Sequence, residues 1–296
     1  MIKNQNHLGA ICMILSVLFF SFMDVLIKIT DEYDVGQVMF CRALFGLIPI
    51  FFLIPKEKLK NFYKTKYVGL HFYRSFVGAI AMYAIFIGLR NLELAEVTSM
   101  AFSGPIWVVI FSILFLGEKI KARRWIAVGL GFIGVLIISK PGFDSLNFYY
   151  IFPVIFTLGF AGVSIFIRKL ALVGEPVYLI AFYFSICSGI FGLLTLPFGG
   201  WAAPSGYDLI LLVLIGLFGS IANLLLTKSY QLAEVSLTTP LKYLTLVFAV
   251  LFGFYFFEEI PTIYTISGAS LIVVSSAIIF IREHELKKPI TLPRQQ

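Results

Sequence analysis

Long apolar runs, separated by short polar segments, fill almost the whole chain. Each run holds roughly 20 residues, which is the length that a helix needs to cross a bilayer. The bilayer core offers no water to the backbone, so runs of this kind form helices. The pattern predicts ten membrane-spanning helices, over residues 8–28, 36–55, 67–89, 94–116, 123–139, 148–168, 177–198, 207–228, 234–257 and 262–281.

Composition supports this reading of the pattern. The 296 residues are 59% hydrophobic and only 13% charged, whereas a soluble domain carries about 25% charged residues. The first run is longer than the apolar part of a signal peptide, it contains Asp24, and no cleavage pattern follows it. The sequence therefore predicts an all-α polytopic membrane protein whose first helix is not cleaved.

Basic residues gather on one side of the ten predicted spans. The loops on the other side hold only Lys28, Arg90 and Lys140. Lysine and arginine in short loops mark the cytoplasmic side, so both termini are predicted to be cytoplasmic. The net charge of +7 is then explained by orientation and by contact with the lipid bilayer. No nucleic-acid partner is expected.

The chain also repeats itself. The letters LAEV occur at Leu94–Val97 and again at Leu232–Val235, each time at the start of a predicted span. At nearly the same spacing, LFFSFMDVLIK (18–28) aligns with LGFAGVSIFIR (158–168). Glu118 and Glu259, each at the end of a predicted span, align as well.

The repeat predicts two domains, a first half over 1–145 and a second half over 146–296 with a short cytoplasmic tail. Each half has five helices, and because five is odd the second half enters the membrane from the opposite side. Inverted repeats of this kind recur in secondary transporters, whose substrate site lies near the midplane between the halves. An old duplication without present functional meaning is the alternative.

Four of the ionisable residues inside the predicted spans are candidates, and each is a functional hypothesis because a charge there needs a cavity or a partner. They are Asp24, Arg42, Arg74 and Lys242. Asp24 lies four residues before Lys28, so we expect a local ion pair for Lys28, whereas for Asp24 that pair and a cavity position both stay open. For Arg42 and Arg74 the alternative to a cavity is a side chain that reaches back to the membrane surface.

The stretch TTPLKYLTL in the ninth span combines a helix breaker with a charge. Pro240 frees a backbone carbonyl one turn back and bends the helix. Lys242 lies about eight residues, or ~12 Å, into the span, and Tyr243 follows it. We therefore expect this stretch to line a cavity. Pro105 gives the fourth span a similar break, so both prolines are candidate gating positions.

Asn223 adds an amide inside the eighth span, for which an interhelical hydrogen bond is the alternative to substrate contact. The letters GLGFIG at Gly129–Gly134 match a nucleotide-binding pattern, but no strand precedes them, so they indicate close helix packing. The histidines and cysteines lack metal-binding spacing, and no hydrolase or P-loop motif occurs. The sequence therefore predicts no metal and no enzyme, with a membrane-embedded enzyme as the remote alternative.

With ten spans in two halves and a glutamate closing spans four and nine, the chain resembles the EamA family of the drug/metabolite transporter superfamily. Further matching pieces are DVLIK, FCR with Arg42, YRS with Arg74, FIGVLIISKP, and TKSYQLAEVSLTTPLKYLTLV. Within the family the chain is most similar to rickettsial-type S-adenosylmethionine uptake transporters.

The resemblance implies a secondary transporter of a small organic metabolite in the cytoplasmic membrane, without ATPase or cofactor. It implies a central cavity lined by spans one to four and six to nine, with spans five and ten outside it. The preferred substrate is S-adenosylmethionine, taken up alone or by exchange. Export of amino acids or amphiphilic compounds is the alternative, and a homodimer is a further open alternative.

Overall fold

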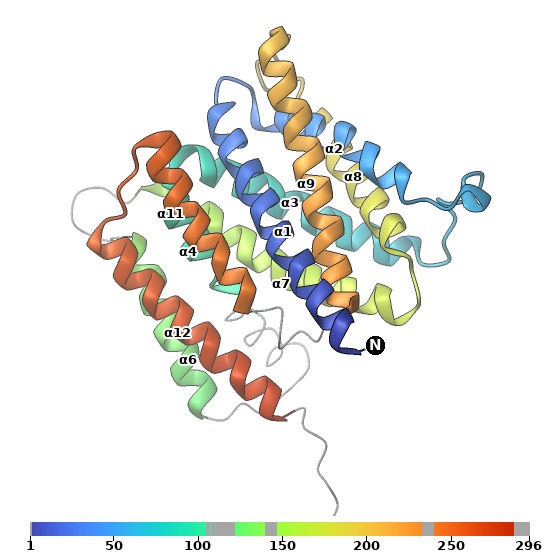
Figure 1. The fold of residues 1–296 in the computed structure, drawn as a ribbon. Coiled ribbons are helices and arrows are strands. Elements are labelled where there is room, and N and C mark those ends of the chain that lie inside the picture. Colours follow the sequence, from blue (N-terminus) through green and yellow to red (C-terminus); the bar gives the residue numbers. More distant parts are fainter. Residues whose placement is uncertain (1, 105–106, 108–121, 140–146, 233–239, 287–296) are drawn as a thin grey trace, which may run out of the picture.

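The computed structural model describes residues 2–104, 107, 122–139, 147–232 and 240–286. These residues form ten α-helices and three short 3-10 helices, and no strand occurs within the described ranges (Figure 1). The α-helices are α1 (Ile2–Ile29), α2 (Val35–Phe52), α3 (Val68–Asn91), α4 (Leu94–Ala101), α6 (Ala122–Ser139), α7 (Ile151–Leu172), α8 (Val177–Leu193), α9 (Gly206–Leu232), α11 (Leu244–Phe257) and α12 (Ile263–Leu286). The 3-10 helices are η1 (Lys56–Lys58), η2 (Phe148–Tyr150) and η3 (Pro240–Tyr243).

The all-helical prediction is therefore confirmed. Four described helices are long and apolar enough to cross a membrane: 7–29 within α1, α2, α3, and 206–229 within α9. Most boundaries fall within a few residues of those expected. The seventh expected span, over 177–198, is an exception because α8 already ends at Leu193. The chain turns there ahead of Pro197, which disfavours a helical conformation of the residue before it.

The expected break in the ninth span lies at the edge of the described residues, because 233–239 are outside them. The span enters the described part of the chain as the 3-10 helix η3, which begins at Pro240, and continues as α11 from Leu244. In the fourth span, α4 ends at Ala101, just before Ser103 and Gly104. The remainder of that span, with Pro105, lies outside the described residues.

Helices of the first half pack mainly against helices of the second. The main contacts join α1 with α9, α2 with α8, α3 with α7, and α6 with α12 (Figure 1). Several contacts come in pairs that exchange the halves: α1 packs on α11 as α7 packs on α4, and α2 packs on α9 as α8 packs on α3. An internal repeat produces this kind of pairing, because equivalent helices have equivalent neighbours.

Small residues set the distance between α6 and α12 at one edge of the molecule. A Cβ built on Gly134 would lie 2.7 Å from the carbonyl oxygen of Gly268, and one built on Gly268 would lie 2.6 Å from that of Gly134. Gly129, by contrast, has no such atom within 4 Å. Of the GLGFIG stretch, Gly134 therefore provides the close helix contact that the sequence indicates.

Candidate functional site

Two arginines from neighbouring helices meet at one aromatic ring in the middle of the bundle. The guanidinium carbon of Arg74 lies 4.1 Å from the ring centre of Phe184 in α8, and that of Arg42 lies 5.8 Å from it. Only 8% of Arg42 and 4% of Arg74 is exposed. Neither side chain reaches the protein surface. The structure therefore does not show the alternative in which these arginines extend to the membrane surface. We call these three residues the arginine cluster.

The two guanidinium groups have few partners. Arg42 Nε donates to the sulfur of Met23 at 3.4 Å. Gly219 of α9 leaves room for that contact, since a Cβ there would lie 2.8 Å from Arg42 Nε. Within the described part of the chain, Nε and Nη1 of Arg74 are buried and make no hydrogen bond. Burying the donors of a charged group without a hydrogen bond costs free energy, so the arginine cluster calls for an acceptor that the described residues do not supply.

Asp24 of α1 is an acidic residue linked to the arginine cluster. It interacts electrostatically with Arg42. It also lines a small pocket with Ser21, Thr98, Thr245 and Phe252. These residues come from α1, α4 and α11, so the pocket has walls from both halves of the chain. This placement favours the cavity position for Asp24 over the local pair with Lys28.

The remaining candidates from the sequence lie apart from the arginine cluster. The Lys242 ammonium is half-buried in η3, 5.4 Å from the ring centre of Phe160 in α7. Pro240 begins η3 and Tyr243 ends it. Asn223 lies in α9 with its side chain half-buried, and the described residues offer its amide no hydrogen bond. The structure therefore brings Arg42 and Arg74 together and places Lys242 against a different ring.

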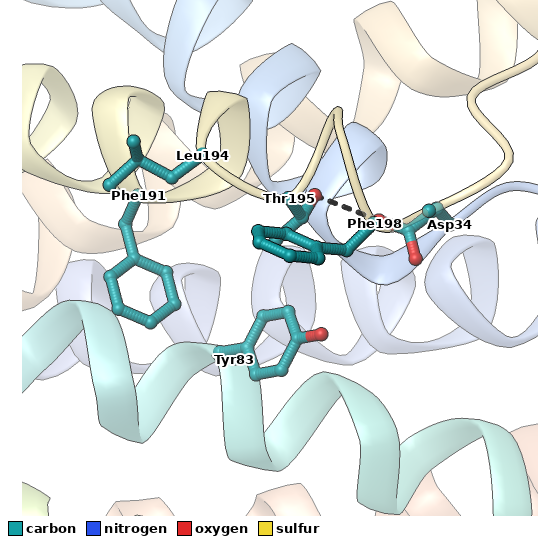
Figure 2. Close-up of a pocket in the computed structure, with 7 residues that line it drawn as sticks. Asp34, Tyr83, Phe191, Leu194, Thr195 and Phe198 are labelled. Atoms are coloured by element: carbon teal, nitrogen blue, oxygen red, sulfur yellow. Dashed lines mark hydrogen bonds between the residues drawn. The ribbon is translucent and has the colours of Figure 1, made fainter.

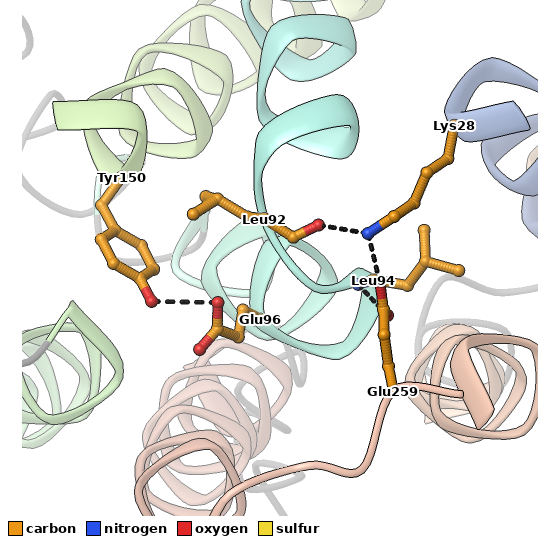
Figure 3. A network of polar contacts seen from close by, with 6 residues as sticks. All are labelled: Lys28, Leu92, Leu94, Glu96, Tyr150 and Glu259. Atoms are coloured by element: carbon orange, nitrogen blue, oxygen red, sulfur yellow. Dashed lines mark hydrogen bonds and ion pairs between the residues drawn. The ribbon is translucent and has the colours of Figure 1, made fainter. Parts of the chain in front are cut away.

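Lys28 has a partner that the sequence did not suggest. It forms an ion pair with Glu259 and donates to the carbonyl of Leu92 at 2.7 Å (Figure 3). Glu259 also accepts from the backbone N–H of Leu94 at 2.9 Å. The expected local pair between Lys28 and Asp24 is wrong, because Lys28 is turned toward the other half of the chain. We call this ion pair and its two backbone contacts the latch.

The local fold explains how Glu259 reaches this place. Glu258 has a φ of 56°, a left-handed conformation that is uncommon outside glycine. The turn lets Glu259 N donate to the carbonyl of Gly253 at 3.0 Å, which caps α11 and aims the side chain back at the bundle. A Cβ on Gly253 would lie 2.9 Å from Glu259 Oε2, so only glycine leaves space for this carboxylate.

Several other contacts tie the same end of the bundle, which we call the Lys28 end. Arg90 donates to the backbone carbonyls of Tyr33 and Thr30. The Tyr33 hydroxyl donates to Asp208 at 2.7 Å, and this hydrogen bond raises the pKa of the Tyr33 phenol. Glu96 accepts from the Tyr150 hydroxyl at 2.9 Å (Figure 3).

A pocket of about 320 Å³ also opens at the Lys28 end, between α2, α3 and the end of α8. Its walls include the side chains of Asp34, Tyr83, Phe191, Thr195 and Phe198. Figure 2 shows the rings of Tyr83 and Phe198 on opposite sides of the space, with Phe191 toward one end and Asp34 toward the other. None of these residues was a candidate from the sequence.

Apolar helices, contacts between two halves and buried charges together define the class as a multi-pass membrane protein with a polar interior. The chain belongs to the EamA-like transporter family, whose profile matches residues 7–140 and 147–281. This confirms the family resemblance, and the protein is a multi-pass transporter of the inner membrane. Family membership and relatives also make it a transporter of small metabolites, and the family and these relatives are transporters rather than enzymes.

Relatives with assigned substrates are named for different compounds. The S-adenosylmethionine uptake transporter of Rickettsia felis is 29% identical, over 83% of each chain. The riboflavin transporter of Rhizobium johnstonii is 28% identical, over 95% of this chain and 92% of its own. The pseudopaline exporter of Pseudomonas aeruginosa is 27% identical, over 90% and 94%.

One solved crystal structure is similar to this chain in fold. It covers 96% of this chain and 99% of its own, with a TM-score of 0.59 and 17% sequence identity. At that identity the likeness concerns the fold alone.

Proposed function

We propose that this protein is a secondary transporter that carries a carboxylate-bearing metabolite past the arginine cluster by alternating access. The observation that carries this is the buried Arg74 side chain, whose Nε and Nη1 lack a partner among the described residues. A carboxylate supplies two acceptors in the geometry that a guanidinium fits. Arg42, on the same ring, adds a second positive charge.

The preferred substrate is S-adenosylmethionine, and uptake alone or in exchange is the preferred direction. Its carboxylate suits the arginine cluster, and its ammonium and sulfonium groups suit Asp24. Phe252 in the Asp24 pocket provides an aromatic face of the kind that attracts cations. The Rickettsia relative named for this substrate supports the choice, as do Lys242 and Tyr243 in the matching stretch of sequence.

The proposed transport path needs two halves that rock against each other. We infer ten spans, with both termini cytoplasmic and the second half inverted, so that the Lys28 end faces away from the cytoplasm. The latch joins Lys28 of the first half to Glu259 of the second. In this proposal it closes the outer entrance and has to break when the outer side opens.

Counterflow of labelled S-adenosylmethionine into proteoliposomes tests the proposal. We expect saturable uptake of the labelled substrate when unlabelled S-adenosylmethionine is present inside the proteoliposomes, and Arg74→Gln should lower this uptake strongly. Lys56→Gln, a substitution in the exposed 3-10 helix η1, is the control and should transport normally. Absence of saturable uptake would overturn the substrate, and excretion of amino acids or amphiphilic compounds on expression would instead favour the exporter.

A further inference from the structure

The pocket at the Lys28 end has the chemistry of a cation-binding cage. Its walls combine three aromatic rings, Tyr83, Phe191 and Phe198, with the Asp34 carboxylate (Figure 2). The faces of aromatic rings are electronegative and attract organic cations, most strongly where water is partly excluded. Tyr83 and Phe191 pack edge to face with ring centres 5.7 Å apart, which fixes two walls of the space relative to each other.

Asp34 has one oxygen committed to structure and one open. Oδ1 accepts from the backbone N–H of Gly36 at 2.8 Å, as an N-cap of α2, and from the Thr195 hydroxyl at 3.0 Å. Oδ2 makes no hydrogen bond to any described residue. Gly199 packs against this carboxylate, and because it has no side chain it does not crowd Oδ2, from which a Cβ there would lie only 2.9 Å. The open carboxylate oxygen can therefore supply a negative charge to a ligand in the pocket.

The charges around the pocket favour a cation. Asp31 and Glu32 precede Asp34 in the same connection between α1 and α2. Arg90 is the positive group that interacts with Asp31 and Asp34, and its Nη1 and Nη2 are bound to backbone carbonyls. Three carboxylates against one guanidinium leave a negative local balance that attracts positive solutes.

We propose that this pocket is a second ligand site, distinct from the arginine cluster, which binds a small organic cation such as a methylated ammonium or sulfonium group. Its volume of about 320 Å³ accommodates a group of that size with its methyls against the rings. If the proposed function is right, a cationic substrate binds at this site first, before it reaches the arginine cluster. The proposal of a cation site does not depend on transport, because it requires only that the cation binds.

Binding can be measured with choline and its neutral carbon analogue, 3,3-dimethylbutan-1-ol. Trp201 is the reporter, since its Nε1 donates to Thr195 Oγ1 at 3.2 Å and Thr195 lines the pocket. Trp107→Phe and Trp125→Phe leave it as the only tryptophan of the three in the chain. In purified protein we expect choline to change Trp201 fluorescence saturably and the neutral analogue to bind at least tenfold more weakly.

Asp34→Asn isolates the charge. Asparagine caps a helix as well as aspartate does, so the bonds to Gly36 and Thr195 are kept while the charge is lost. We expect choline affinity to fall at least tenfold, with an unchanged elution profile and melting temperature. Asp31→Asn removes a charge from the same connection without lining the pocket, and should change affinity less than threefold.

Gly199→Ala is a second variant, which crowds Oδ2 and should also weaken choline binding. Nanodiscs of phosphatidylglycerol alone or mixed with phosphatidylethanolamine separate two sources of the cation. Competition by the amine lipid identifies a headgroup as occupant, and its absence identifies a free solute; either result supports the cage. Equal binding of choline and its neutral analogue, or unchanged binding in the folded Asp34→Asn variant, would overturn it. Choline binding without counterflow would overturn only the proposed substrate.

Discussion

The latch and the arginine cluster hold their charges in opposite ways. In the latch, Lys28 and Glu259 neutralise each other, and each makes a further hydrogen bond to the backbone around Leu92 and Leu94. In the arginine cluster, Arg42 and Arg74 share one ring, and the described residues leave two nitrogens of Arg74 without an acceptor. The latch is a charge pair whose two members neutralise each other, whereas Arg74 keeps unpaired donors, which in our proposal bind the substrate carboxylate.

Replacing Arg74 by glutamine should have the largest effect on transport. Losing one partner of a buried charge pair costs about 2–5 kcal/mol, so substrate binding should weaken on the order of 100-fold. Stability should stay the same or rise, because an unpaired buried charge is removed. Counterflow and thermal unfolding measure the two effects.

Arg90→Gln is the matched comparison for Arg74→Gln. Arg90 is also an arginine of α3, but its guanidinium donates to the carbonyls of Tyr33 and Thr30. We expect this variant to lose stability by about 1.5–3 kcal/mol, as expected for hydrogen bonds to a charged group. If Arg74→Gln instead lost stability and kept transport, the arginine cluster would be a structural feature like the latch.

Lys242→Met tests whether the half-buried charge of Lys242 serves transport, as proposed for the arginine cluster, or stability, as expected for the latch. Methionine keeps an apolar stem against the Phe160 ring but removes the charge 5.4 Å from its centre. We expect transport to be lost while membrane insertion and folding persist, because the ammonium is needed for the substrate. Lys242→Arg, which keeps the charge, should retain part of the activity, and near-normal uptake by Lys242→Met would show that this charge is dispensable.

Glu259→Gln should have a moderate effect, mainly on stability. It leaves Lys28 without its negative partner and should lower the free energy of unfolding by about 1.5–3 kcal/mol. Thermal unfolding of Lys28→Met, Glu259→Gln and the double variant forms a double-mutant cycle. We expect the double variant to be less destabilised than the sum of the single variants; strictly additive effects would mean that the two residues do not form a coupled latch.

Gly134→Leu should have the smallest effect on transport, because α6 packs mainly on α12 at an edge of the bundle (Figure 1). The added side chain would collide with the Gly268 backbone and cost about 1–3 kcal/mol of stability. Transport per folded molecule should be unchanged. Gly129→Leu is the control, with open space at its Cβ, and reduced turnover in folded Gly134→Leu would give this helix pair a part in transport.

The fold was largely predictable because bilayer physics leaves a clear periodic signal in the sequence. The apolar runs predicted the helices, among them α11, which follows the 3-10 helix that begins at Pro240. The candidate site was predictable only in part. Buried charges identified Arg42, Arg74, Asp24 and Lys242 one at a time, because an ionisable residue in an apolar run is conspicuous.

The partners of these charges could not be predicted from the sequence. Lys28 and Glu259 lie 231 residues apart, and which residue meets Lys28 depends on how α1 and α11 pack. Phe184 is one of 32 phenylalanines, and nothing in the sequence distinguishes the one that lies under both arginines. The Asp34 pocket depends on the turns after α8, where the helix was expected to continue.

The most direct test of the central claim is a comparison of two labelled substrates in counterflow, S-adenosylmethionine and its decarboxylated analogue. The analogue lacks the carboxylate that Arg42 and Arg74 are proposed to bind. We predict that the wild-type protein prefers S-adenosylmethionine strongly and that Arg74→Gln loses this preference. If both proteins transport and Arg74→Gln prefers S-adenosylmethionine as strongly as the wild type does, the arginine cluster does not bind the carboxylate.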